Sequence, residues 1–366
     1  MELLIRLIDE YYIYYCAFFW CLLCGAVYTI KCDRSTQNKI YGAFSYIPLA
    51  VLGALRDCSV GADTITYCYW YTNFWNVQLD GFFYKNFECG YVILNRLLYF
   101  MCESPQFLLV VTSVTITCGL GAFFYKTSPN FYISTLLFVG FFFYLNSFTI
   151  FRQYLALVLV LYGIRALWLE KKYYFLCCVF LASTIHFSAI VFLPLILIHR
   201  LSMRMIIATL AIVICCSVFI AMQGLEGISC PIENTPYYHY IGGRYDIATE
   251  YGAGVLRIIM CAACAAYGVV SWQHNENLRV AEHKWAIFMT AVSVVPMVLG
   301  YQIDILNRFK EYVFIFICIL LPYNLECYSG KMKWLLGALL IFMSLVYFSR
   351  MLYVSETSSL VYKSCF

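Results

Sequence analysis

Residues 131–169 read FYISTLLFVGFFFYLNSFTIFRQYLALVLVLYGIRALWL, two long apolar runs separated by Arg152 and Gln153. A transmembrane helix needs about 20 mostly apolar residues, because the hydrocarbon core of a bilayer is roughly 30 Å thick. We therefore predict spanning helices near 130–150 and 154–169.

The composition of the whole chain agrees with a lipid environment. Hydrophobic residues make up 63% of the 366 residues and charged residues only 12%, against about 45–50% and about 25% in an ordinary soluble domain. A soluble protein of this size would lack the surface charge to stay dispersed, whereas a lipid-facing helix exposes apolar side chains without cost. The net charge of +4 is small, so we expect no nucleic-acid partner.

The same reasoning extends along the chain and predicts an all-α integral membrane protein. We expect a polytopic bundle of about ten to twelve spans, forming a single membrane domain over residues 1–366. The further predicted spans lie near 11–30, 40–55, 107–125, 205–222, 252–272, 285–303, 312–328 and 334–353.

Basic residues in short loops predict the orientation, because Lys and Arg collect on the cytoplasmic side. The loop 31–39, then Lys171–Lys172, Arg200 with Arg204, Arg279 with Lys284, and Lys331 with Lys333 form five such clusters. The two longer loops, 56–106 and 223–251, then face outward. Cysteines in these polar loops, Cys58, Cys89 and Cys230, would pair if that side is an oxidising compartment.

The run at 173–198 conflicts with this simple topology. Lys172 and Arg200 flank one apolar stretch, yet both are predicted to be cytoplasmic. A break around Thr184–His186 would resolve the conflict, since irregular backbone is tolerated where it lines a cavity. The alternative is that one basic cluster departs from the rule.

Three titratable residues are candidate catalytic groups, namely Asp63, Glu88 and His186. His186 lies inside an apolar run, where an ionisable side chain costs roughly 2.5–3.5 kcal/mol and is therefore a functional candidate. A neutral imidazole would suit a general base at neutral pH. A histidine bonded to a neighbouring carbonyl is the alternative.

Candidate residues for binding an anion are mostly arginines near the predicted outer face. They are Arg56, Arg152 with Gln153, Arg244 with Tyr245, and Arg308. The planar guanidinium contacts phosphate oxygens in pairs, so several arginines at one face would bind a diphosphate. Arg56 would alternatively pair with Asp63, and Arg152 would alternatively be an interfacial anchor whose charge reaches the headgroups.

Signatures of nucleotide chemistry are missing from the sequence. It contains no Walker A motif, dinucleotide glycine loop, H-E-x-x-H or G-x-S-x-G pattern. We therefore expect no cofactor, and because arginines would supply positive charge we also expect no metal. The substrate should itself be anchored in the membrane.

The polar motifs in their order resemble the EpsG family of polysaccharide polymerases, which is close in role to Wzy-type polymerases. The resemblance covers about residues 40–325. It rests on the motifs Arg56…Gly61-x-Asp63…Tyr67, Glu88-x-Gly90-Tyr91…Asn95, Phe151-Arg152-Gln153-x-x-Ala156, Ala182-x-x-x-His186-x-Ser188-Ala189 and Asn307-Arg308…Tyr312.

This resemblance implies a multi-pass glycosyltransferase of the bacterial inner membrane. Its substrate would be an undecaprenyl-diphosphate-linked oligosaccharide, polymerised at the outer face into O-antigen, capsule or exopolysaccharide, with a chain-length regulator as a further partner. Arg152, Arg244 and Arg308 would stabilise the leaving diphosphate, and Asp63, Glu88 or His186 would take the acceptor proton. A flippase for the same glycan is the alternative.

Overall fold

The computed structural model describes residues 2–78, 81–84, 87–223, 251–300, 306, 308–354 and 360–366, and they are almost entirely helical. These residues divide into two compact units, one formed by Met1–Ile196 with Gly330–Phe366 and the other by Leu197–Ser329. The all-α membrane fold is confirmed. The single membrane domain stays a prediction.

The first unit contains the following elements: α1 (Glu2–Leu23), η1 (Cys24–Thr29), α2 (Arg34–Ala54), α3 (Thr64–Asn73), η2 (Phe74–Asn76), β1 (Phe83–Tyr84), β2 (Phe87–Glu88), α4 (Cys89–Met101), α5 (Pro105–Thr127), α6 (Phe131–Gly140), α7 (Phe143–Thr149), α8 (Phe151–Trp168), α9 (Lys172–Ile185), η3 (Phe187–Phe192) and α19 (Gly330–Val354). α10 (Leu195–Ile198) lies at the boundary with the second unit.

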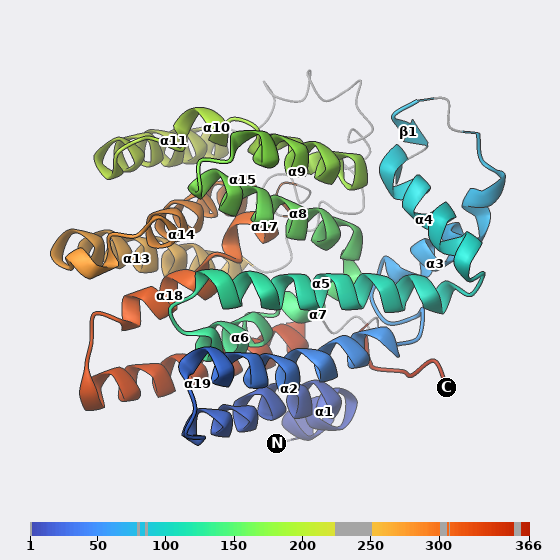
Figure 1. The fold of residues 1–366 in the computed structure, drawn as a ribbon, viewed down its shortest axis with the longest axis horizontal. Helices are drawn as coiled ribbons and strands as arrows, with labels where there is room; N and C mark the ends of the chain where they lie inside the picture. The colour runs from blue at the N-terminus through green and yellow to red at the C-terminus, as the bar shows by residue number, and fades with distance from the viewer. Residues whose placement is uncertain are drawn as a thin grey trace. The chain divides into compact units, whose positions relative to one another are not determined.

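Four helices of the first unit pack in successive layers, in the order α2, α5, α8 and α9 (Figure 1). α5 and α8 form the buried middle of this stack. Leu109 and Leu120 of α5 and Leu157 and Val160 of α8 have no exposed surface. Because neighbouring helices cover both faces, α5 and α8 are apolar all round, as expected of buried helices.

The second unit comprises α11 (Met203–Gln223), α13 (Tyr251–His274), η5 (Glu276–Leu278), α14 (Ala281–Val292), α15 (Val294–Leu299), α17 (Lys310–Phe314) and α18 (Ile317–Leu325). α13 packs on α14 and α18. The buried ring of His283 stacks on Tyr323, with ring centroids 4.8 Å apart, and its Nδ1 is 3.0 Å from the Leu278 carbonyl oxygen.

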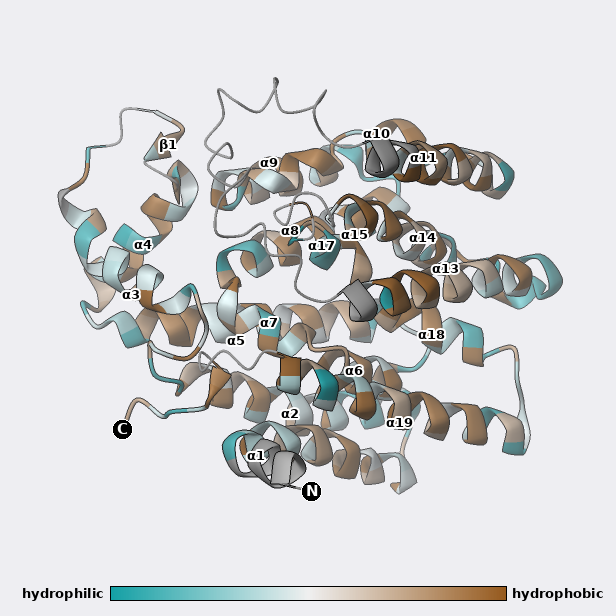
Figure 2. Cartoon of the chain, turned by 180° about the vertical axis from the view of Figure 1, so that it is seen from behind, coloured by the Kyte–Doolittle hydropathy of each residue, from teal (hydrophilic) through white to brown (hydrophobic). Residues whose placement is uncertain are grey.

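Five helical segments in the described residues are long and apolar enough to span a bilayer: Glu10–Thr29, Pro105–Thr127, Phe151–Trp168, Gly254–His274 and Gly330–Val354. α6 and α7 add a sixth if they form one span with a 50° bend. Hydrophobic residues run along most helices, and many of the hydrophilic ones gather near helix ends and connections (Figure 2). The chain is thus a membrane protein.

Several of the predicted spans are divided into shorter helices, which accounts for part of the difference from the predicted number. The run 130–150 is interrupted after Gly140, where α6 ends, and Phe142 before α7 has a φ of 71° in the left-handed region. The runs 285–303 and 312–328 are likewise divided, into α14 with α15 and α17 with α18. Hydrophobicity alone does not predict where an apolar run breaks into separate helices.

Two predicted segments have internal structure. Residues 56–106 form α3, the β1–β2 hairpin and α4, in place of an open loop. The predicted break in the run 173–198 is confirmed, because α9 ends at Ile185 and His186 has extended backbone angles of −149° and 110°. The loop 223–251 lies almost wholly outside the described residues.

Candidate functional site

Glu88 lies where the hairpin turns into a helix. It ends β2, pairs with Phe83 of β1, and is the N-cap residue of α4. Its side chain is only 3% exposed. A carboxylate buried to this degree needs charged or hydrogen-bonding partners, and these come from two segments far away in the sequence.

The first partner segment is the break after α9. The backbone N–H of Phe187 donates a hydrogen bond of 2.7 Å to Glu88 Oε1. His186 Nδ1 lies 3.4 Å from the same oxygen. Because α9 stops at Ile185, the amide of Phe187 is free of helical bonding and is able to point at the carboxylate.

A glycine allows this approach. A Cβ built at Gly90 would meet the side chain of Thr184 and lie 2.7 Å from its carbonyl oxygen. Gly90 follows Glu88 by two residues and Thr184 precedes His186 by two. Any larger side chain at position 90 would therefore push the end of α9 away from Glu88.

The second partner is Arg152, in the first turn of α8. Its Nη1 donates to Glu88 Oε2 at 3.0 Å. Its guanidinium carbon also lies over three aromatic rings, 4.9 Å from the centroid of Phe87, 5.6 Å from Tyr91 and 5.8 Å from Tyr67. Aromatic faces attract a cation, so they hold the guanidinium together with the carboxylate.

We call Glu88, Arg152 and His186 the Glu88 cluster. Burial alone would raise the pKa of Glu88, but His186, Arg152 and the Phe187 amide together lower it below its ordinary value. Glu88 is therefore an anion at neutral pH. Since its carboxylate faces Nδ1 of His186, we assign the proton to Nδ1, which makes Nε2 the basic ring nitrogen.

The structure thus brings together three of the predicted site residues, and two others neighbour residues of the site along the chain, Gln153 next to Arg152 and Asp63 one turn before Tyr67. Gln153 is buried on α8. Asp63 is the N-cap residue of α3. Their roles stay predictions.

Arg56 has a structural environment in this fold. Its side chain is 1% exposed, donates a 2.6 Å hydrogen bond to Ser113 Oγ, and lies 4.5 Å from the ring centroid of Phe148. These contacts tie the end of α2 to α5 and α7. A role in binding diphosphate stays a prediction.

The remaining predicted residues belong to other parts of the chain. Arg308 lies in the second unit, just before α17, and is partly buried. Arg244 and Tyr245 lie outside the described residues.

The sequence motifs contain Tyr67 and Tyr91, but sequence reasoning gave no role beside Arg152 to either ring or to Phe87. Tyr91 follows Glu88 by three residues, which places both on one face of the first turn of α4, and this spacing was the available signal. Phe87 carries no such signal, because it is one of many phenylalanines in the chain.

Comparison with known protein families identifies the family of this chain. A family model described as the EpsG family matches residues 39–364. The chain belongs to the EpsG family. This membership supports a polysaccharide polymerase-like role in general and fits a bacterial membrane protein. No curated protein and no solved structure has a significant match.

Proposed function

We propose that this EpsG-family protein is a glycosyltransferase that polymerises undecaprenyl-diphosphate-linked oligosaccharide units at the outer face of the bacterial inner membrane. The observation that supports it best is the Glu88 cluster, a buried carboxylate that orients both an arginine and a histidine. A buried carboxylate whose pKa is shifted by specific charged partners is a candidate functional group.

In this proposal Arg152 faces the leaving group. The hydroxyl of the acceptor sugar attacks the anomeric carbon of the donor chain, and the bond from that carbon to the lipid diphosphate breaks. Negative charge then grows on the diphosphate. A guanidinium already fixed by Glu88 and three aromatic rings would stabilise this charge without reorganising, which is the source of much enzymatic rate enhancement.

His186 would receive the proton of the acceptor hydroxyl on Nε2. Glu88 would stabilise the resulting imidazolium through Nδ1, as a carboxylate does for a histidine base in other enzymes. The lowered pKa of Glu88 makes it the weaker base of the two. Among the three predicted bases, this arrangement therefore favours His186.

The test is the surface glycan pattern of a deletion strain complemented with variants of this gene. Arg152→Ala should reduce a ladder of long chains to a single repeat unit, while the protein stays in the membrane. Arg165→Ala is the matched control, since Arg165 lies in the last turn of the same helix and should preserve the ladder.

The outcomes separate the candidate functions. A normal ladder with Arg152→Ala would refute the proposed site. Loss of even the single repeat unit from the surface in the deletion strain would instead indicate a flippase, because units would then accumulate on the cytoplasmic side.

A further inference from the structure

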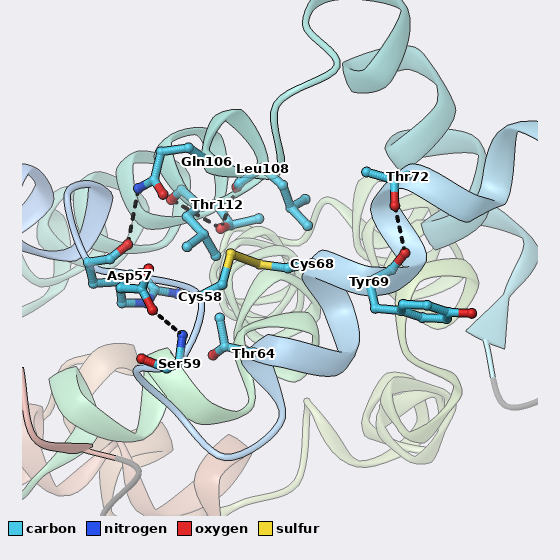
Figure 3. Close-up of a disulfide and its surroundings, with 12 residues drawn as sticks. Asp57, Cys58, Ser59, Thr64, Cys68, Tyr69, Thr72, Gln106, Leu108 and Thr112 are labelled. Carbon is cyan, nitrogen blue, oxygen red and sulfur yellow. Dashed lines mark hydrogen bonds between the residues drawn. A yellow bond between two sulfur atoms is a disulfide. The ribbon is translucent and has the colours of Figure 1, made fainter. Parts of the chain in front are cut away.

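A disulfide joins the loop after α2 to the second turn of α3. Cys58 and Cys68 are bonded, with their Cα atoms 6.3 Å apart (Figure 3). The sequence-based pairing was therefore incomplete: Cys58 pairs with a cysteine inside a helix, while Cys89 is a free thiol. Cys230 lies outside the described residues.

The Cys58 end of this bond is firmly held. The backbone N–H of Asp57 donates to the Lys363 carbonyl at 2.8 Å, and the N–H of Cys365 donates to the Leu55 carbonyl at 2.9 Å. The side-chain amide of Gln106 on α5 donates to the Ala54 and Arg56 carbonyls. The loop is thus fixed to both α5 and the C-terminal segment.

The Cys68 end of the disulfide is adjacent in sequence to Tyr67, which contacts the Glu88 cluster. Tyr67 precedes Cys68, packs its ring 4.4 Å from the ring of Phe151, and lies under Arg152. One turn earlier, the hydroxyl of Thr64 donates to the Phe148 carbonyl at 2.8 Å. α3 therefore contacts the connection into α8 along one face, and the disulfide is its covalent attachment to the fixed loop.

We infer that the Cys58–Cys68 disulfide forms on the extracytoplasmic side and positions Tyr67 beneath Arg152 for catalysis. In forming it, the two thiols lose two electrons and two protons to a disulfide-bearing oxidase, which is reduced to its dithiol. The catalytic part of this inference rests on the proposed function; the location of the bond does not.

The location follows from the positions of two cysteines at the ends of α2. Disulfides persist in oxidising compartments, whereas the cytosol keeps thiols reduced. Cys58 follows the end of α2 and Cys32 precedes its start. The predicted span 40–55 lies almost wholly within α2, whose 21 residues extend about 31 Å, close to the hydrocarbon thickness. We therefore take α2 as a further crossing, beyond the five helices identified by length and composition, and this places Cys32 on the cytoplasmic side.

The first experiment tests the location with a membrane-impermeant maleimide on intact spheroplasts, read by peptide mass mapping of the native chain. Cys58, which is half-buried, should react only after a reductant is added, whereas Cys68 is only 6% exposed and is not used as a reporter. Cys32, which is exposed, should react only after the membrane is permeabilised. Labelling of Cys58 without reductant would refute the disulfide, and labelling of reduced Cys58 only in permeabilised membranes would refute its location.

The second experiment tests the positioning role with purified protein and the lipid-linked repeat unit extracted from the deletion strain. Small displacements in an active site lower rates strongly, so Cys58→Ser, Cys68→Ser and the double variant should each lose turnover about tenfold or more. The three losses should be equal, because one missing sulfur already abolishes the bond. KM should change less than twofold, because the disulfide does not touch substrate.

A reductant provides the internal check. It should lower the turnover of the wild type to that of Cys58→Ser, and reoxidation should restore it, while the double variant responds to neither. Cys32→Ser should behave as the wild type throughout. Unchanged turnover in the double variant, or a larger loss there than in either single variant, would refute the positioning role. If the wild type itself fails to polymerise, the proposed function fails, and the maleimide result still decides the location.

Discussion

Replacing either Glu88 or Arg152 by alanine should strongly lower the free energy of unfolding of the first unit. Replacing both should lower it by less than the sum of the two single losses. The two side chains are 3% and 13% exposed and lie 3.0 Å apart. Removing one partner of a buried ion pair leaves an uncompensated charge and costs roughly 3–5 kcal/mol. We expect this loss for Glu88→Ala and for Arg152→Ala.

The double variant leaves no unpaired charge at the site. Residues in direct contact show coupling energies of roughly 0.5–3 kcal/mol, and the burial of this pair places it toward the upper end. The assay is reversible unfolding of the purified protein in mixed micelles with increasing denaturing detergent. The free energy of unfolding is compared among wild type, the two single variants and the double variant.

Glu276 and Arg279 offer a matched control pair. Their side chains are 85% and 45% exposed and lie 3.3 Å apart, so solvent screens the attraction and little coupling should be measured. If the losses at Glu88 and Arg152 add within about 0.5 kcal/mol, the two groups do not stabilise each other and the reasoning about the cluster is wrong.

Two further predictions use the same stability assay, and a third adds the glycan ladder. The folded-state pKa of Glu88 is lowered, so its ion-pair stabilisation is complete above the ordinary glutamate pKa of about 4.3 and is lost as the pH falls through the folded value; the gap between wild type and Glu88→Gln should be kept or widened from pH 8 to about 5, because a protonated His186 also attracts the carboxylate, and should narrow below, whereas a gap that closes near neutral pH would contradict this. Gly61→Ala should cost roughly 1–3 kcal/mol, because Gly61 has a φ of 105° and a Cβ there would lie 2.7 Å from the Phe148 carbonyl oxygen, while Gly81→Ala meets no atom within 4 Å and should be neutral; equal effects would argue against the turn geometry. Gly90→Ala should lower glycan chain length as well as stability by displacing α9, and a normal ladder would show that this close approach is not needed for activity.

Much of the fold was predictable because lipid imposes simple rules on sequence. A run of about 20 apolar residues has to be a helix, since backbone polar groups have no other partner in hydrocarbon. The break at His186 was also predictable, because basic residues on both sides of one run contradicted a single crossing. The break at Phe142 was not, since nothing in an uninterrupted phenylalanine run marks a left-handed residue.

The sequence was sufficient to identify the residues of the site, but not to predict which of them contact one another. Arg152 and His186 stand out as ionisable residues beside or within apolar runs, and Glu88 stands out in a motif at the end of a predicted outward loop. Their contact depends on how α4, α8 and α9 pack, which periodicity does not specify. Arg56 shows the limit of this reasoning, because the same signal led to a side chain whose contacts hold α2 to its neighbours.

The energetic argument for function lies in the cost of the Glu88 cluster. A buried ion pair often stabilises a protein no more than apolar side chains of the same volume would. In a chain whose residues are 63% hydrophobic, an apolar junction of α4, α8 and α9 would be the easier solution. This fold instead places a carboxylate there, aims a backbone amide at it, and closes the gap with a glycine. Such an arrangement is poorly explained by stability and well explained by the need to hold a guanidinium and an imidazole in fixed orientation, as polymerisation on a lipid diphosphate would require.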